Sequence, residues 1–307
     1  MTDSVPSSGI DPLSARLREL ADYLAAPADA RLTEEQRALA LGIARRLVGD
    51  VAARLDRGID TEGLWREWLR GGLPGAERLA RICFARAEEH RWRELSAQRS
   101  SPPPILPDAE EGVVDPPSVG APLSDIDRAY LALQIADRRR FDALGHPELA
   151  IADLDGDLFR SLLLDIAAWR LAEVSLNQAR ATELGDAVRV ATECHAKEAG
   201  IAQAGAAYHN LLGPALSDAV ADAITRHDWP TLIALAAAAH RRSYDDMALA
   251  LLTAETAALP SLLAPLNLDR PALAPLEASL AMLPSRAIIE DGARDYGEML
   301  APGRNTR

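Results

Sequence analysis

The sequence predicts an all-α protein, and two observations support this. Ala and Leu dominate the apolar residues whereas aromatic residues make up only 4%, and small side chains of this kind let helix axes approach one another. Runs of β-branched residues are almost absent, Val113-Val114 and Ile288-Ile289 being the nearest approach. Because strands favour β-branched and aromatic residues, we expect helices throughout and no substantial sheet.

The N-terminal part predicts about four helices. Residues 1–10 are polar and are expected to be disordered. Asp11, followed by proline, fits the N-cap of a first helix. A second helix is expected from Thr33, whose spacing to Gln36 matches a capping box. Gly58 is expected to follow its end.

A short third helix and a charged fourth helix follow. The third carries Trp65 and Trp68, which we expect to be buried. The fourth begins near Pro74 and contains a run that could resemble a nucleic-acid-binding face, but acidic residues interrupt it. We expect this run to be a solvated helix end with ion pairs four residues apart. The run consists of Arg86, His90, Arg91, Trp92, Arg93 and Arg99, interrupted by Glu88, Glu89 and Glu94.

A proline-rich acidic segment divides the chain in the prediction. Its prolines and acids leave few apolar groups to bury, which is typical of an inter-domain linker. The expected organisation is a disordered terminus, a helical bundle, a linker, a helical-repeat domain and a tail, at residues 1–10, 11–99, 100–122, 123–285 and 286–307.

Helices resume after the linker, and the first is expected to have Ser124 as its N-cap. The triplet that begins at Leu123 recurs at Leu216, about two units of a HEAT-type repeat later. The predicted helices span residues 124–143, 156–178, 185–212, 217–227, 230–240, 243–257 and 271–283.

The acidic stretch from Asp153 to Asp157 resembles the start of a calcium-binding loop. Such a loop would need Gly and Glu at positions 158 and 164, where this chain has Leu158 and Leu164. Acids at this place commonly cap the following helix. We therefore expect capping, and no metal site.

The predicted helix over 185–212 carries one of the two candidate sites. Gly205 lies on its apolar face, where it would allow a neighbouring helix to approach closely. Glu198 falls within the same face, and His195 precedes it at a spacing that lets the two side chains meet. A buried Glu beside a His can begin an acid–base site, but it can equally be a structural polar pair, and we favour the structural interpretation.

The second candidate is His240, which precedes an apolar helix as phospho-acceptor histidines of helical bundles do. No ATP-binding domain follows it, and a plain helix-junction histidine is the favoured interpretation. The chain also lacks phosphate-binding loops, dinucleotide fingerprints, nucleophile elbows and zinc-protease motifs. No cofactor is therefore expected.

Charge and cysteine usage limit the partners and the compartment. The first 100 residues are balanced, with 16 Arg against 16 Asp and Glu, so the net charge of −13 falls on the rest. An acidic surface repels nucleic acids and anionic membranes. Cys83 and Cys194 are far apart, and no signal-peptide pattern begins the chain. We expect a cytoplasmic protein that binds neither nucleic acid nor membrane.

Two segments resemble a bacterial domain family of unknown function that is built from HEAT-like helix pairs. They run from Leu32 to Val51 and from Leu216 to Leu235, and the resemblance consists of apolar periodicity and helix caps. It implies a HEAT-like stack in the C-terminal half. It implies no activity, because none is established for that family.

The leading hypothesis is a non-catalytic scaffold or regulatory module that binds another protein, since helical stacks expose long ridges. The first alternative is a signalling component that is phosphorylated on His240 or His195. The second is an enzyme with an acid–base site at His195 and Glu198. The sequence leaves the partner and the oligomeric state open.

Overall fold

The computed structural model describes residues 34–73, 75–100, 123–173 and 178–283. Within these ranges the chain is helical, and its only β-pairing is an isolated bridge between Phe141 and Pro147. The predicted all-α class is therefore confirmed. The helix expected from Asp11, the Thr33 cap, residues 101–122 of the linker and the C-terminal tail lie outside the described residues.

The first three described helices are α2 (Glu34–Leu55), α3 (Thr61–Gly71) and α4 (Ala76–Ser100). Helix α3 begins after Asp60, whose carboxylate accepts a hydrogen bond from the Gly63 amide at 3.1 Å. Trp65 and Trp68 are buried, as predicted. Helix α3 is therefore held in place by its aromatic face.

Helix α5 (Asp125–Arg138) follows the predicted linker and begins where the sequence indicates. The Ser124 hydroxyl accepts a hydrogen bond from the Asp127 amide, and the Asp127 carboxylate accepts one from the Ser124 amide. This is a complete capping box. The helix ends about five residues earlier than predicted, because the chain turns there into a loop closed by the bridge between Phe141 and Pro147.

Helix α6 (Gly156–Glu173) starts at the acidic stretch, which acts as a cap. The Asp155 carboxylate accepts hydrogen bonds from the amides of Asp157 at 3.0 Å and Leu158 at 2.9 Å. The first-turn amides of a helix need such partners. The stretch therefore has the capping role that the sequence predicts.

The predicted helix over 185–212 is wrong, because the chain forms two helices, α7 (Gln178–His195) and α8 (Ile201–Leu212). A methyl group on Gly200 would lie 2.4 Å from the carbonyl oxygen of Ala152, so only glycine fits at the turn. Asp153 then caps α8 from a distance, its carboxylate accepting a hydrogen bond from the Ile201 amide at 2.7 Å.

The rest of the described chain forms short helices around α10. The role predicted for Gly205 is confirmed, because a methyl group there would lie 2.7 Å from the Cβ of Ala234 in α10. The longer helices of this part are α9 (Leu216–Thr225), α10 (Trp229–His240), α11 (Tyr244–Thr253) and α13 (Ala274–Leu280). Shorter turns are η2 (Ile151–Asp153), η3 (Gly213–Ala215), α12 (Leu259–Leu262), η4 (Ala264–Leu266) and η5 (Arg270–Leu273).

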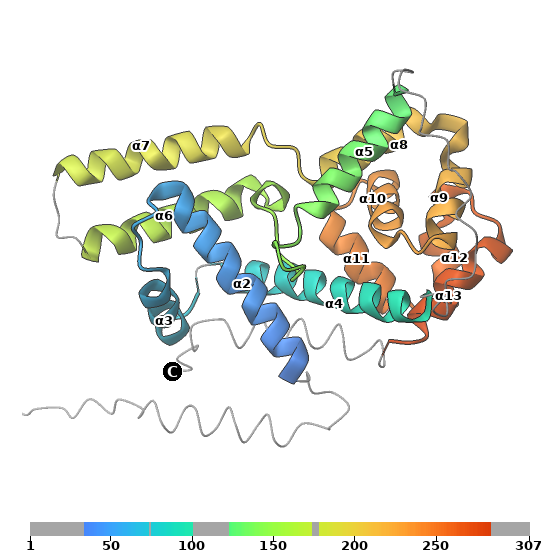
Figure 1. The fold of residues 1–307 in the computed structure, drawn as a ribbon, viewed down its shortest axis with the longest axis horizontal. Helices are drawn as coiled ribbons and strands as arrows, with labels where there is room; N and C mark the ends of the chain where they lie inside the picture. Colours follow the sequence, from blue (N-terminus) through green and yellow to red (C-terminus); the bar gives the residue numbers. More distant parts are fainter. Residues whose placement is uncertain (1–33, 74, 101–122, 174–177, 284–307) are drawn as a thin grey trace, which may run out of the picture.

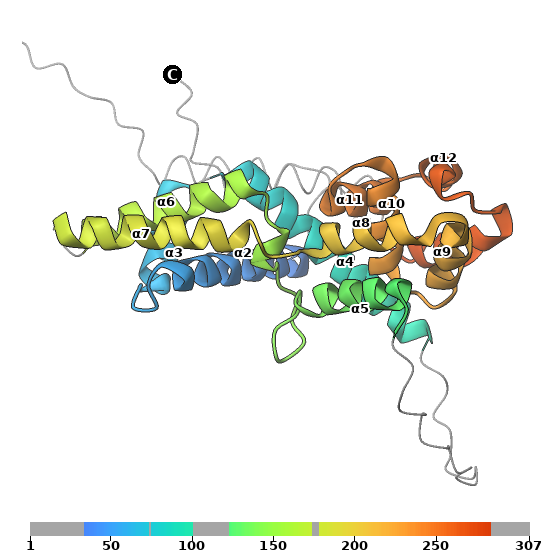
Figure 2. The same cartoon turned by 90° about the horizontal axis from the view of Figure 1, so that it is seen from above.

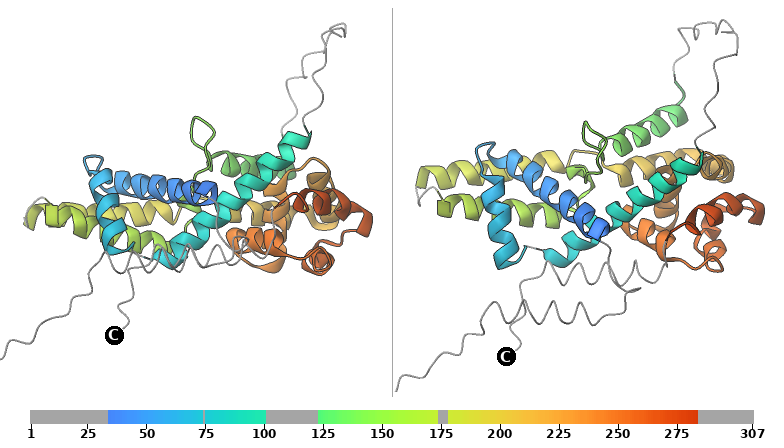
Figure 3. Two further views of the ribbon diagram at one scale, coloured as in Figure 1. Left: turned by 90° about the horizontal axis from the view of Figure 1, so that it is seen from below. Right: turned by 60° about the horizontal axis from the view of Figure 1, so that its bottom comes forward.

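Helices α6 and α7 lie side by side and extend to one end of the molecule, whereas α8–α13 gather at the other end (Figure 1 and Figure 2). Helix α4 runs diagonally between the two ends (Figure 3). The indole of Trp92 in α4 stacks on that of Trp229 in α10, with 4.6 Å between the ring centroids. It also donates a hydrogen bond to the Ser279 hydroxyl at 2.9 Å.

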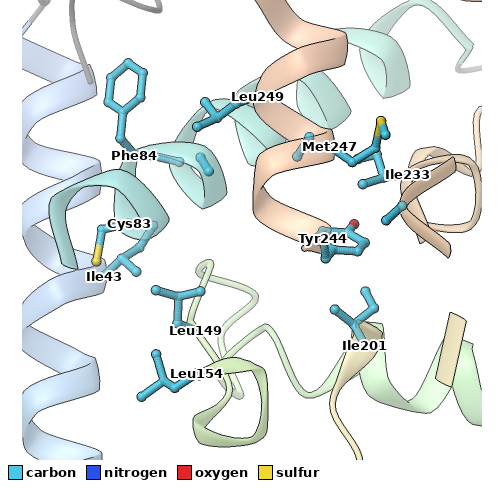
Figure 4. Close-up of a cluster of buried hydrophobic side chains, with 14 of the residues drawn as sticks. Ile43, Cys83, Phe84, Leu149, Leu154, Ile201, Ile233, Tyr244, Met247 and Leu249 are labelled. Atoms are coloured by element: carbon cyan, nitrogen blue, oxygen red, sulfur yellow. The ribbon is translucent and has the colours of Figure 1, made fainter. Parts of the chain in front are cut away.

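A single hydrophobic core contains residues from both sides of the predicted domain boundary. Figure 4 shows Ile43 and Phe84 in the same region as Leu154, Tyr244 and Met247. The segments before and after residues 101–122 therefore share their packing, and we do not expect either to keep its fold alone. The HEAT-like character of the C-terminal half stays a prediction.

Candidate functional site

The first candidate pair, His195 and Glu198, is not assembled into a site. His195 ends α7, where its Nε2 lies 3.2 Å from the Leu154 carbonyl oxygen and its ring stacks on Phe159 at 4.4 Å. Glu198 lies in the turn between α7 and α8, where Arg54 of α2 donates hydrogen bonds to its carboxylate at 2.8 and 3.3 Å. Each side chain therefore has its own structural partner.

The environment of Glu198 also differs from the predicted apolar face. Its side chain is 32% exposed and that of Arg54 is 41% exposed. The expected burial was based on one continuous helix, and the break after His195 changes the direction in which Glu198 points. The prediction of a buried Glu198 is wrong, and its partner is Arg54 rather than the expected His195.

His240, the second candidate, ends α10 and is partly buried. Its Nε2 lies 2.6 Å from the carbonyl oxygen of Leu262, so this nitrogen carries the proton and donates the hydrogen bond. A phosphoryl group cannot be accepted at Nε2 without breaking that bond. This hydrogen bond joins the end of α10 to the last residue of α12.

The most densely charged part of the interior lies elsewhere, on α4, which places Glu89 at the centre of a buried ion cluster. Arg140 donates two parallel hydrogen bonds to the Glu89 carboxylate, at 3.0 and 2.8 Å. Tyr244 of α11 donates a third, at 3.0 Å. Both Glu89 and Arg140 are fully buried. Two-bond pairing of this kind fixes the orientation of both groups.

Two further arginines surround the same carboxylate. Arg93 donates two hydrogen bonds to Asp137, at 2.7 and 2.9 Å, and lies 3.6 Å from Glu89. Arg86 donates hydrogen bonds to the carbonyl oxygens of Arg140 at 2.8 Å and of Glu148 at 3.1 Å. The predicted solvated helix end is therefore wrong at its centre, because these groups line the interior.

The charges in this Glu89 cluster determine its protonation. Burial would raise the pKa of Glu89, but Arg140, Arg86 and Arg93 together lower it to about 2. Burial raises the pKa of Asp153, whose carboxylate lies 3.4 Å from Arg140. The cluster therefore keeps Glu89 ionised and its arginines paired.

Asp245 stands partly exposed at the edge of the Glu89 cluster, and its carboxylate forms no hydrogen bond or ion pair with the residues that the structure describes. Burial raises its pKa to about 7, and the positive charge of Arg140 only partly opposes this effect. Its neighbour Asp246 forms an ion pair with Arg81 instead. Asp245 is therefore the group of this cluster that we expect to titrate near neutral pH.

The charged groups of the Glu89 cluster are bound to one another. Arg140 binds Glu89 and Arg93 binds Asp137, and none of these side chains lines either of the two hollows described below. Among the described residues, no three His, Cys, Asp or Glu side chains are grouped so as to hold a metal ion. The arrangement joins α4 to α5 through Arg93 and Asp137, and to α11 through Glu89 and Tyr244.

The first surface hollow lies between α4 and α13 and has a volume of about 410 Å³. Gln98 is the only polar residue that lines it; the others are Leu95, Ala278, Ala281 and Met282. No acid, base or nucleophile lines this hollow. It therefore offers no chemistry of its own.

The second hollow is an open apolar groove between α6 and α7, with a volume of about 310 Å³. Leu164 is 49% exposed although it is one of the large aliphatic residues of α6. Small residues form part of the lining, and nothing lies within 4 Å of a methyl group built on Gly185. The groove is lined by Leu164, Ala167, Ala168, Leu171, Ala181, Leu184, Gly185 and Val188.

Neither the Glu89 cluster nor the groove was predicted from the sequence. For the cluster a signal existed: Arg86 lies within about 60° of Leu79 and Cys83 around the axis of α4, so it shares their apolar face. The groove had no comparable signal in the sequence, because it exists only where α6 and α7 pack side by side and no third helix covers them in the described part of the chain.

Comparisons with known proteins add no family. No family model, curated protein or solved structure matches the chain. In the described part of the chain, every helix is too short or too polar to cross a lipid bilayer.

Proposed function

We propose that this protein is a non-catalytic interaction module whose α6–α7 groove binds an amphipathic helix of another protein. The groove carries the proposal, because its lining is apolar and open to solvent. Grooves between two helices commonly accept the apolar ridge of a third helix. The polar interior supports the same conclusion, since its charged groups are already paired with one another.

The lining of the groove indicates what such a helix would present. Ala167, Ala168 and Gly185 leave room at the middle, whereas Leu164 and Leu184 supply apolar contacts. A partner helix with large apolar residues three and four positions apart would fill this space. Of these two leucines only Leu164 is exposed, since Leu184 is already buried. Covering Leu164 fully would contribute at most roughly 1.5–3 kcal/mol.

The test fills the groove without disturbing the fold. Gly185→Leu places a side chain where a methyl group has nothing within 4 Å, and leucine is a better helix former than glycine. Gly49→Leu is a matched control, since Gly49 also lies inside a helix with open space around it but on α2. Both variants should fold at least as stably as the wild type.

Affinity capture from the native cell lysate, quantified by mass spectrometry, then compares the three proteins. We expect a partner that is retained by the wild type and by Gly49→Leu and is lost by at least tenfold with Gly185→Leu. If every captured protein binds Gly185→Leu as well as it binds the wild type, the groove is not the binding site.

The phospho-acceptor alternative is tested with the same preparations. Incubation with acetyl phosphate should leave no acid-labile phosphate on Nε2 of His240 or His195, because this nitrogen of each ring lies against a carbonyl oxygen. Stoichiometric labelling that His240→Ala abolishes would instead support a signalling role. The enzyme alternative, centred on His195 and Glu198, predicts a shared site for two side chains that have separate partners here.

A further inference from the structure

The outer face of α5 is left without a partner by the described part of the chain. Leu131 is 48% exposed and Ile135 is 46% exposed, although they lie four residues apart on one side of the helix. The opposite side packs against α8 and α10 through residues that include Ala129, Leu133 and Ala136. Figure 2 shows α5 at the edge of the molecule, with α8 on its inner side.

Charges are distributed unequally along this outer face. Asp125 and Asp127 lie in the first turn, whereas Arg138 and Arg139 lie at the other end. Both arginines are exposed, and neither forms an ion pair within the described residues. The helix thus has an acidic end, an apolar middle and a basic end, and its two ends are complementary in charge.

We propose that a second copy of this chain covers the outer face of α5, with the two helices antiparallel about a two-fold axis. A two-fold axis level with Leu133 brings Leu131 of one copy against Ile135 of the other, and the reverse contact follows by symmetry. The same arrangement places Asp127 at the level of Arg138 and Arg139 of the second copy. One symmetry operation therefore satisfies both the apolar and the charged residues.

The positions around the helix axis support this pairing. At about 100° per residue, Asp127 and Arg138 lie on the same flank of Leu131, within about 40° of it. In an antiparallel pair, residues on the same flank of each helix meet. Asp127 of each copy therefore faces Arg138 of the other. On the opposite flank, Arg128 is already paired with Asp125, so Arg139 of the second copy meets a neutral ion pair.

Two exposed leucines outside the helix extend the same symmetry. Leu123 is 53% exposed just before α5, and Leu144 is 83% exposed in the loop that follows it. They lie at nearly equal distances along the chain from Leu133, one before the helix and one in the loop after it. The contact is still small, and we expect a dissociation constant on the order of 10 µM, as for weak specific dimers.

The test uses charge reversal in two separate variants. Asp127→Arg introduces two arginine–arginine contacts into the dimer and also removes the carboxylate half of the Ser124 capping box. Arg138→Asp introduces two acid–acid contacts and leaves the capping box intact. Each variant alone should be at least tenfold weaker in self-association. An equimolar mixture restores both pairs across the interface, so it should form a heterodimer with an affinity near that of the wild type.

Sedimentation velocity at protein concentrations of about 5–200 µM measures these affinities. Circular dichroism checks that each variant folds. Leu131→Glu combined with Ile135→Glu should give a monomer, while Gly185→Leu, in the groove of the proposed function, should still dimerise. A wild type that is monomeric throughout, a dimer that survives Leu131→Glu with Ile135→Glu, or a mixture that fails to associate overturns the proposal. The proposed function is tested by the groove variants, so either proposal can fail alone.

Discussion

The Glu89 cluster and the α6–α7 groove differ in how their side chains are satisfied. In the cluster, Glu89 is charged and fully buried, yet it accepts three hydrogen bonds and is surrounded by arginines. In the groove, Leu164 is apolar yet half exposed. The charged groups around α4 are thus paired within the protein, whereas the apolar surface between α6 and α7 is open to solvent and is the surface to which we assign binding in our proposal.

The largest expected effect follows from breaking the Glu89 cluster. Glu89→Gln removes the one negative charge that Arg86, Arg93 and Arg140 share. Removing one partner of a buried ion pair typically costs about 3–5 kcal/mol, because the remaining charges stay buried. Urea unfolding at pH 7 measures this loss.

Arg81→Ala is the matched control for Glu89→Gln. It also removes a two-bond pairing to a carboxylate, that of Asp246, but both side chains are exposed. Exposed pairs contribute about 0–1 kcal/mol. Equal losses for the two variants would contradict the claim that burial makes the cluster different.

Trp92→Ala is expected to have an effect of similar size and to report on the shared core. The indole is fully buried, stacks on Trp229 and donates a hydrogen bond to Ser279. Truncating a core tryptophan costs about 3–5 kcal/mol. Tryptophan fluorescence and far-UV circular dichroism should report one common transition for the variant, as for the wild type. Two separate transitions would favour the domain boundary predicted from the sequence.

Asp245 gives the cluster a pH dependence of intermediate size. Its pKa is about 7 in the folded protein and about 3.9 in an unfolded chain. Between these values the unfolded chain is ionised while the folded protein keeps the proton, so the stability contributed by this group falls as pH rises from about 4 to 7. Asp245→Asn removes this loss.

Asp245→Asn should therefore stabilise the protein relative to the wild type, and by about 1–3 kcal/mol more at pH 8 than at pH 5. Urea titrations at the two pH values measure the difference. Glu89 acts in another window: its lowered pKa of about 2 means that its contribution is lost only as pH falls from about 4.5 toward 2. A constant difference between variant and wild type from pH 5 to pH 8 would contradict the assignment to Asp245.

Local features were predictable from the sequence, whereas the sites were not. Ser124 and Asp155 cap their helices as expected, because capping depends on residues within one turn. The break at Gly200 was missed, because it is set by the carbonyl of Ala152, which is close only in the folded chain. The burial of Glu89 likewise depends on Arg140 and Tyr244, which lie 51 and 155 residues away. The charge of Glu89 alone predicts a solvent-exposed side chain. Its burial is favourable only because Arg140 and Tyr244 bind the carboxylate.

The smallest expected effect is that of Glu198→Leu, which compares a second Glu–Arg pair with that of Glu89. Arg54 binds the Glu198 carboxylate with two hydrogen bonds, as Arg140 binds Glu89. The difference is exposure: about a third of the Glu198 side chain remains in contact with water. After Glu198→Leu, Arg54 can therefore be hydrated, and we expect a loss of at most about 1 kcal/mol.

A double-mutant cycle with Arg54→Ala isolates the coupling between Arg54 and Glu198, which should be about 0.2–1 kcal/mol. His195→Ala, tested alongside, removes the stacking on Phe159 without touching the ion pair. Its effect should add to that of Glu198→Leu, because the two side chains have separate partners. Coupling between His195 and Glu198 above about 1 kcal/mol would mean that they act as one unit, and would revive the acid–base site that this geometry does not support.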